Sequence, residues 1–242
     1  MTAVLLVIAL AGCGNSSTDN SREPETAAFS ESTQEETAGS ISAESQIAQV
    51  SSDGNNSIEP SEQDDIPSGS DTLVVYFSRT GEQYGVGVIN EGNTAIVAKM
   101  IAEQTAADTF EILPADDYYP MTYSELTDVA KQEQNNNARP AYKGSVPDLS
   151  QYNIIFIGAP VWWGDWPMIC YTFFENEDLS GKTLYPFSTN AGSGLSGFDK
   201  KLSAAVPDST VGEGFAVAGT DCQNDRDGVR GKVNNWLEKL GF

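Results

Sequence analysis

From residue 72 onward, short apolar stretches rich in Val, Ile, Phe and Tyr alternate with longer stretches in which apolar residues recur at helical spacing. Runs of β-branched and aromatic residues are typical of strands that are buried on both faces of a parallel sheet. The pattern predicts five such strands, at residues 72–78, 109–114, 153–160, 183–189 and 212–219. The stretch NIIFIGAP at 153–160 gives the clearest signal, and the last stretch gives the weakest.

Helices are predicted between the strands. Asn93 and Thr94 mark one helix start, because an apolar stripe at helical spacing follows them. Further helices are predicted over residues 123–134, from Pro167 through MICYTFFEN, over 197–205, and at the C-terminus. This alternation indicates an α/β domain with a doubly wound, five-stranded parallel sheet and helices on both faces. Such sheets bind ligands beyond the carboxyl ends of the strands, so the loops after the first, third and fourth strands form the candidate site.

The first 13 residues, MTAVLLVIALAGC, have the pattern of a lipoprotein signal peptide. Their apolar run is shorter than the roughly 20 residues of a membrane-spanning helix, but it fits the hydrophobic region of a secretory signal. The sequence LAGC resembles a bacterial lipobox, which implies that Cys13 becomes the lipidated first residue of the mature protein. No Lys or Arg precedes the apolar run, which agrees with a start further upstream. The alternative is an apolar N-terminus that merely contains a cysteine.

Residues 14–71 have the composition of a disordered tether. They are rich in Ser, Glu, Asp, Gln, Thr and Asn, and Arg22 is their one basic residue. A segment so poor in apolar side chains cannot offset the conformational entropy that folding removes. We therefore predict that the folded domain comprises residues 72–242. The signal peptide, the lipidated cysteine and the solvated spacer indicate that a lipid anchor holds this domain at the extracytoplasmic face of the bacterial cell membrane.

Charge and residue types exclude several classes of function. The net charge of −22 at pH 7 argues against nucleic acid as a partner. The sequence contains no histidine, which excludes Ser–His–Asp and Cys–His hydrolases and histidine-bound zinc. Cys170 and Cys222 lack metal-ligand spacing, so no metal site is predicted. Cys170 is expected to be an inert core thiol and Cys222 to be exposed. The chemistry must therefore depend on a cofactor, carboxylates or hydroxyl groups.

The first candidate loop begins with SRTG at 78–81 and ends with EGNT at 91–94. Its hydroxyl and amide groups lead into a helix N-terminus, where free N–H groups and the helix dipole favour an anion. A phosphate can be held here by neutral donors alone. For this loop by itself, the alternative is an ordinary Ser/Thr-rich turn between a strand and a helix.

A strand that ends in S-x-T-G, followed by N-T at a helix start, resembles the phosphate loop of flavodoxins. The resemblance implies an FMN cofactor, and it places five residues of this loop among those that bind it: Ser78, Arg79, Thr80, Asn93 and Thr94. Residues 82–92 are an insertion relative to the compact loop of that family. Tyr84, within the insertion, is available to pack over the site.

The second loop, APVWWGDWP at 159–167, contains three of the four tryptophans. Exposed tryptophans after a buried strand are costly unless they cover a flat apolar group such as an isoalloxazine ring, on which stacking adds about 0.5–1.5 kcal/mol. The alternative is that all three cap the sheet, and we expect one to stack near the flavin and the others to lie in the core. The segment P-x-W-W-G resembles flavodoxin-like lipoproteins and oxidoreductases. That resemblance implies flavin contacts from Pro160, Val161, Trp162, Trp163 and Gly164, and a peptide flip at Gly164 on reduction.

The third loop, STNAGSGLSG at 188–197, is glycine-rich and follows the fourth strand. The resemblance implies that backbone N–H groups here bond the pyrimidine oxygens of the flavin, with contacts from Thr189, Asn190, Gly192 and Gly194. Relatives often carry histidine where this chain has Asn190. Taken alone this loop is a weak signal, since a flexible surface loop would look similar, but the three loops together follow the right strands in the right order.

Three tyrosines after the second predicted strand, Tyr118, Tyr119 and Tyr123, have two interpretations. They either shade the rim of the flavin or pack the second helix onto the sheet, and we favour the packing role.

The flavodoxin resemblance spans nearly all of residues 72–242 and leaves three functions open. One is a one-electron carrier that meets a redox partner protein through the exposed flavin edge. Another is an FMN reductase that passes electrons from NAD(P)H to a quinone or a similar small-molecule acceptor. The third is a lipoprotein that binds a ligand without redox chemistry. The lack of a second dinucleotide fingerprint favours the carrier, which we expect to be monomeric.

Overall fold

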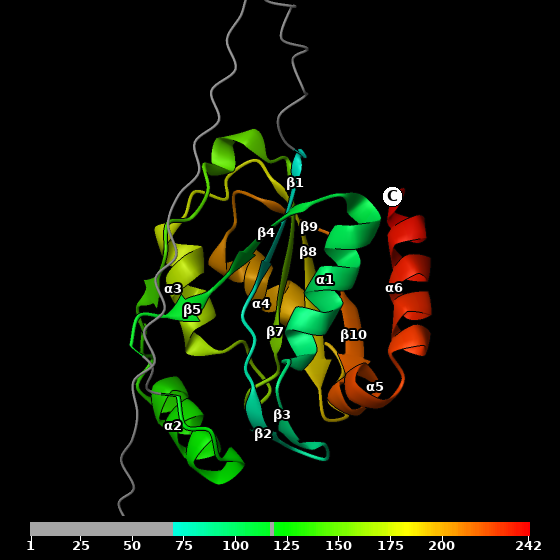
Figure 1. Ribbon diagram of the computed structural model, residues 1–242. Helices are drawn as coiled ribbons and strands as arrows, with labels where there is room; N and C mark the ends of the chain where they lie inside the picture. The colour runs from blue at the N-terminus through cyan, green and yellow to red at the C-terminus, as the bar shows by residue number, and fades with distance from the viewer. Residues whose placement is uncertain (1–69, 117–118) are drawn as a thin grey trace, which may run out of the picture. The chain divides into compact units, whose positions relative to one another are not determined.

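The computed structural model describes residues 70–116 and 119–242 (Figure 1). The predicted signal peptide, the lipobox with Cys13, Tyr118 and nearly all of the predicted tether lie outside these residues. Within the described ranges, no helix combines the length and the apolar character that a membrane crossing requires.

A parallel sheet of five main strands forms the centre of the domain, as predicted. Its order is β4 (Asp108–Glu111), β1 (Thr72–Tyr76), β7 (Ile154–Pro160), β8 (Thr183–Asn190) and β10 (Phe215–Ala218). Counted along the chain, this is the 2-1-3-4-5 order of a doubly wound sheet. The chain moves from β1 to one side and then returns to the other, so the strand order reverses between β1 and β7. A crevice is expected at the carboxyl ends of these two strands.

Helices cover both faces of the sheet (Figure 1). One face carries α1 (Asn93–Thr105) and α6 (Arg226–Leu240), whose apolar residues share a core cluster with Val74, Phe156 and Phe187. The other face carries the remaining long helices, which are α2 (Tyr123–Asn135), α3 (Met168–Asn176) and α4 (Phe198–Ala205). Because both faces are covered, all five residues of β1 are buried, which explains the unbroken apolar run at the start of the domain.

Two predicted strands are interrupted. The stretch 109–114 leaves the parallel ladder after β4, and β5 (Leu113–Pro114) pairs antiparallel with β6 (Tyr142–Lys143). The stretch 212–219 was too long, because β9 (Thr210–Val211) and β10 both pair with β8 and residues 212–214 separate them. The gap lies opposite Pro186 in β8. Proline has no N–H to donate to a neighbouring strand, so the ladder between β8 and the edge of the sheet cannot continue at Pro186.

The insertion at 82–92 forms a structure that the sequence did not predict. Its chain folds into an antiparallel hairpin of β2 (Gly81–Gln83) and β3 (Gly87–Ile89). A short helix, α5 (Gly219–Asn224), and a 3-10 turn, η1 (Leu149–Gln151), also went unpredicted. The predicted helix after Pro167 begins one residue later, at Met168, because Pro167 is the capping residue.

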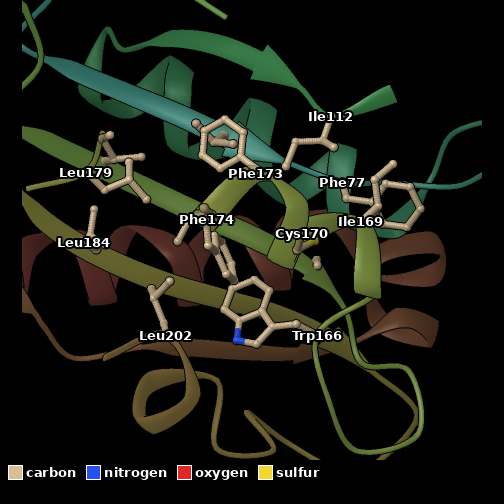
Figure 2. Packing of buried hydrophobic residues seen from close by; sticks show 14 of the residues in the cluster. Phe77, Ile112, Trp166, Ile169, Cys170, Phe173, Phe174, Leu179, Leu184 and Leu202 are labelled. Atoms are coloured by element: carbon tan, nitrogen blue, oxygen red, sulfur yellow. The ribbon is translucent and has the colours of Figure 1, made fainter. Parts of the chain in front are cut away.

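The two cysteines of the domain are both buried. Cys170 lies in α3 beneath the sheet, beside Ile169 and Phe173 in the cluster that Figure 2 displays. Cys222 is fully buried, at 0% exposure, so the prediction of an exposed thiol was wrong. Its surroundings are polar in sequence, but α5 turns the thiol inward against α1 and α6.

Candidate functional site

A cavity of about 370 Å³ opens at the carboxyl ends of the central strands. Its lining comes from the hairpin, the start of α1, α2, and the segments that follow β7 and β8, together with Gly219. This is the crevice expected from the reversal of strand order. We call it the aromatic cavity, and its lining residues are Gln83, Tyr84, Asn93, Tyr123, Leu126, Thr127, Ala130, Pro160, Val161, Trp162, Trp163, Thr189, Asn190, Ala191 and Gly219.

A tight turn after β7 presents two tryptophans to this cavity. Trp162 and Asp165 exchange two backbone hydrogen bonds, of 2.9 and 3.0 Å. The residues between them, Trp163 and Gly164, both have positive φ, at 51° and 73°. A two-residue turn with both central residues in the left-handed region reverses the chain most compactly. Tryptophan rarely adopts this conformation, so contacts outside the turn must hold Trp163 in place.

Helix α2 supplies those contacts. Trp163 Nε1 donates to the carbonyl of Thr127 at 2.9 Å, and the Lys131 ammonium lies 5.0 Å from the centre of the indole ring. The carbonyl of Trp163 accepts a longer bond, of 3.4 Å, from Gln134. Trp163 is nevertheless 54% exposed. Its ring therefore spans the gap between the turn and α2 at the mouth of the cavity.

Beneath the turn, Asp165 anchors the segment to the domain. Its carboxylate accepts from the backbone N–H of Trp166 at 2.8 Å and from the hydroxyl of Tyr171 at 3.0 Å. Lys201 from α4 forms an ion pair with it at 3.2 Å and also donates to the carbonyl of Gly164. Burial, and then the Asp165 charge, raise the pKa of Tyr171. The predicted flip of the Gly164 peptide stays a prediction, and it would break the Lys201 bond.

The three tryptophans of the segment have different roles. Trp166 is core: it is 1% exposed and stacks on Phe198 with ring centres 3.7 Å apart (Figure 2 places it beside Phe174). Trp162 is half-buried and meets Phe77 and Tyr119 edge-on at 5.3 and 5.2 Å. Two tryptophans, rather than the one expected, thus line the cavity.

The start of α1 forms the polar end of the cavity. Gln223 Nε2 donates to Asn93 Oδ1 at 2.7 Å, which fixes the orientation of the amide. A Cβ on Gly219 would lie 2.5 Å from Asn93 Nδ2, so only glycine permits this approach. The hydroxyl groups of Thr94 and Thr189 share a buried hydrogen bond of 2.8 Å. This bond joins the helix start to the end of β8.

In the third loop, side chains mainly stabilise the loop itself. Asn190 Oδ1 accepts from the Gly192 N–H at 2.9 Å, and Asn190 Nδ2 donates to the carbonyl of Val217 at 3.0 Å. Ser188 donates to the carbonyl of Gly194. Thr189 and Asn190 line the aromatic cavity, whereas Gly192 and Gly194, like Gly164 in the second loop, are not among its lining residues.

The predicted phosphate loop is divided between two places. Asn93 lines the aromatic cavity and Thr94 is buried behind it. Ser78, Arg79 and Thr80 instead line a second cavity. Ser78 Oγ is already engaged, because it accepts the N–H of Ala95 at 3.0 Å and so caps α1. The insertion separates the two halves of the loop.

Two walls of the cavity come from outside the three predicted loop motifs, and only the second was foreseen. One is α2, which contributes Leu126, Thr127 and Ala130. The other is the hairpin, where Tyr84 lines the cavity as the sequence suggested and packs on Tyr123 with ring centres 5.8 Å apart. An apolar stripe predicts that one face of α2 is buried, but it does not show that part of this face lines a cavity. Tyr123 was assigned mainly to packing, yet it lines the cavity, while Tyr119 packs against Phe77 as expected.

None of the described residues that line the aromatic cavity is charged. Its chemistry is limited to aromatic faces, hydroxyl and amide groups, and backbone N–H and C=O groups. Such a lining suits a flat, largely neutral ring that carries hydrogen-bonding edges. It offers no carboxylate or lysine that could transfer a proton as a general acid or base.

Comparisons with known proteins agree with this architecture. The family model of flavodoxin matches residues 72–240. A presumed flavoprotein from Bacteroides uniformis ATCC 8492 is 32% identical, with a TM-score of 0.56, and the match covers 70% of this chain and 99% of that one. Another, from Bacteroides eggerthii DSM 20697, is 29% identical with a TM-score of 0.55, covering 71% and 98%.

A flavoprotein from Lactobacillus acidophilus NCFM, whose structure contains FMN, is 20% identical with a TM-score of 0.50, and the match covers 60% of this chain and 91% of that one. At that identity the likeness concerns the fold alone. No curated protein matches the chain. Since the family model spans the entire parallel sheet and all its helices, this chain belongs to the flavodoxin family.

Proposed function

We propose that the domain binds FMN in the aromatic cavity and serves in electron transfer. The observation that carries this proposal is the uncharged, tryptophan-lined cavity at the point where the strand order reverses. Its volume of about 370 Å³ lies within the range of roughly 300–1,000 Å³ that small-molecule sites occupy. FMN, when bound, would supply the redox chemistry, and the protein would hold, orient and shield it.

The lining suggests how the parts of FMN are distributed. Trp162 and Trp163 offer apolar faces for the isoalloxazine ring. Asn93 and the first N–H groups of α1 suit the phosphate, because the helix dipole favours an anion there. The backbone around Thr189 and Asn190 suits the polar edge of the ring. Ser78, Arg79 and Thr80 remain predicted contacts of the phosphate.

A one-electron carrier fits the cavity better than a hydride-accepting reductase. Tyr84 and Tyr123 pack on each other and line the same cavity as the tryptophans, and both are at least one-third exposed. A flavin that contacts several of these aromatic side chains would leave little of its ring free for a nicotinamide to stack on. Trp163 and Tyr84 form an apolar rim, which suits a redox partner protein. A reductase with a small-molecule acceptor is the second candidate that the following experiment tests.

Reduction of the purified chain, loaded with FMN, separates the two activities. If the protein is a carrier, NADPH leaves the flavin spectrum unchanged over the time in which dithionite bleaches it. Rapid bleaching by NADPH, followed by reoxidation on adding a quinone, would identify a reductase instead. A chain that retains no flavin would support neither and would favour a binding lipoprotein.

We also propose that Cys13 is lipidated and that the domain works at the extracytoplasmic membrane face. The support is the LAGC sequence after an apolar run, followed by an acidic, polar spacer. In cells, the wild-type chain is expected in the membrane fraction and a Cys13→Ser variant in the soluble fraction. Equal amounts of both variants in the membrane fraction would contradict lipid anchoring.

A further inference from the structure

The direction of one amide decides how the polar end of the aromatic cavity meets an anion. Asn93 lines the cavity and is the first residue of α1. Its side chain carries an oxygen that only accepts hydrogen bonds and an NH2 group that only donates them. A phosphate dianion has only acceptor oxygens. Asn93 therefore attracts a phosphate when its NH2 group faces the cavity and repels it when its oxygen does.

Gln223, in α5, fixes this direction through two hydrogen bonds. Its Nε2 donates to the backbone carbonyl of Glu91 at 2.9 Å and to Asn93 Oδ1 at 2.7 Å. A backbone carbonyl cannot donate, so the Gln223 atom that meets Glu91 must be the NH2 group. Because the same group also meets Asn93, the Asn93 atom in contact with it must be the oxygen. One backbone carbonyl thus sets the orientation of both amides.

The other end of the Asn93 amide is then available to a ligand. Nδ2 lies beside Gly219, a second lining residue, where a Cβ would come within 2.5 Å of it. Within the described ranges Nδ2 donates to no acceptor, and it is not one of the buried side-chain atoms that lack a partner. A donor that is unpaired yet accessible at the wall of a cavity is suited to a ligand that accepts.

The backbone at the start of α1 offers donors to the same ligand. Ser78 Oγ accepts the N–H of Ala95, and the carbonyl of Gly92 accepts that of Ile96. The N–H groups of Asn93 and Thr94 have no acceptor in the part of the chain that the structure describes. Free N–H groups and the helix dipole favour an anion here. The Asn93 amide adds a donor to this set only in the orientation that Gln223 imposes.

Gln223 is itself held in place by the corner between α5 and α6. Its neighbour Cys222 is fully buried and anchors α5 in the core beside α1 (Figure 1). Arg226, at the start of α6, pairs with the Glu91 carboxylate at 2.8 Å. This corner thus grips Glu91 twice, by its carbonyl and by its side chain. The half-buried amide of Gln223 is fixed before any ligand binds.

We propose that Gln223 is a positioning residue that makes the cavity select FMN over riboflavin, which is the same flavin without the phosphate. The inference rests on the proposed FMN site. Gln223 is not among the lining residues of the cavity, so it acts through Asn93. The faces of Trp162 and Trp163 meet a ring that both flavins share. Gln223 therefore governs the ratio of the two affinities and not the affinity for the ring.

Fluorescence titration of the purified chain with FMN and with riboflavin measures this ratio. Gln223→Met removes both hydrogen bonds without adding charge and frees the Asn93 amide to turn, so the preference for FMN should fall roughly 3-fold to 10-fold. Gln223→Glu keeps the shape but can only accept, so Asn93 turns its NH2 group away from the cavity and its oxygen toward the phosphate. The preference should then fall roughly 10-fold to 100-fold. Riboflavin affinity should stay at the wild-type value in both variants.

Asn224→Asp is the matched control for the added charge. Asn224 is the exposed neighbour of Gln223 at the end of α5, and its replacement makes the same change from amide to carboxylate without a contact to Asn93. Its preference for FMN should equal that of the wild type. If the Gln223 variants fail to fold, NMR of the wild type still decides: the side-chain NH2 signals of Asn93 should shift further with FMN than with riboflavin.

Three results would overturn the positioning role. Gln223→Met and Gln223→Glu could weaken both flavins equally, which would make Gln223 a purely structural residue. Asn224→Asp could lower the preference as much as Gln223→Glu while Gln223→Met leaves it unchanged, which would assign the effect to charge alone. Equal shifts of the Asn93 signals with both flavins would also refute it. A wild type that binds both flavins equally would contradict this inference alone, whereas one that binds neither would contradict the FMN site itself.

Discussion

Replacing each of two tryptophans by alanine should separate stability from cofactor binding. Trp166 is 1% exposed, stacks on Phe198, and meets Phe174 edge-on at 5.3 Å. Its Nε1 also donates to the carbonyl of Phe198 at 3.2 Å. Removing a buried tryptophan costs about 3–5 kcal/mol through lost burial and the cavity left behind. Loss of the hydrogen bond from Nε1 adds about 1 kcal/mol and places Trp166→Ala toward the upper end of that range.

Trp163 is the opposite case. At 54% exposure its ring loses little burial. The bond to Thr127 contributes about 1 kcal/mol, and the exposed contact with Lys131 about 0.5–1 kcal/mol. Trp163→Ala should therefore lower the free energy of unfolding by only about 1–2 kcal/mol. Loss of a stacking face worth about 0.5–1.5 kcal/mol should raise the dissociation constant of FMN by roughly 2-fold to 13-fold.

Urea denaturation followed by far-UV circular dichroism measures the first quantity, and fluorescence titration with FMN measures the second. The reasoning fails if Trp166→Ala changes the free energy of unfolding by less than about 1 kcal/mol, below the range for a buried aromatic residue. It also fails if Trp163→Ala destabilises the domain as strongly as Trp166→Ala does.

Three further outcomes are expected. In a variant without the lipobox cysteine, a thiol reagent should label neither Cys170 nor Cys222 before the domain unfolds. Burial raises the pKa of both thiols, and it raises that of Cys222 to about 12. Rapid labelling of the native domain would contradict the burial of Cys222 in α5. Gly219→Ala should weaken FMN binding about tenfold or more, a change of about 1.4 kcal/mol, because the new Cβ displaces the Asn93 amide at the polar end of the cavity. Gly231→Ala is the control: its new Cβ would meet nothing within 4 Å, so the affinity for FMN should stay unchanged. Burial, then the nearby Glu111, raise the pKa of Tyr76 from 10.0 to about 12, so this phenol favours folding below pH 10 and that contribution is lost as pH rises towards 12. The urea midpoint of the wild type should fall more steeply across this window than that of Tyr76→Phe, and parallel curves would refute the shift.

Much of the fold could be predicted because the signals were local. Each main strand is an apolar run bounded by turn residues, and Asn93 starts a helix in the position predicted. The break between β9 and β10 was harder to predict, because Pro186 interrupts the pairing of a neighbouring strand and not its own strand. A single sequence does not show which strands pair, so the N–H group that Pro186 lacks could not be linked to a gap in the neighbouring strand.

The site was predicted only in part, for a similar reason. The sequence identified the loops, and seven of the predicted residues line the aromatic cavity: Asn93, Pro160, Val161, Trp162, Trp163, Thr189 and Asn190. It could not indicate that the hairpin would divide the phosphate loop and place Arg79 on a different cavity. Nor could it indicate that α2 would supply a wall, since a helix stripe does not reveal what it packs against.

The central claim is that the aromatic cavity holds FMN, and a fluorescence titration of the purified chain with FMN tests it most directly. The account predicts saturable quenching of flavin emission at one FMN per chain, with weaker quenching for Trp162→Ala. Flavin emission that stays equal to that of free FMN at every protein concentration would contradict it.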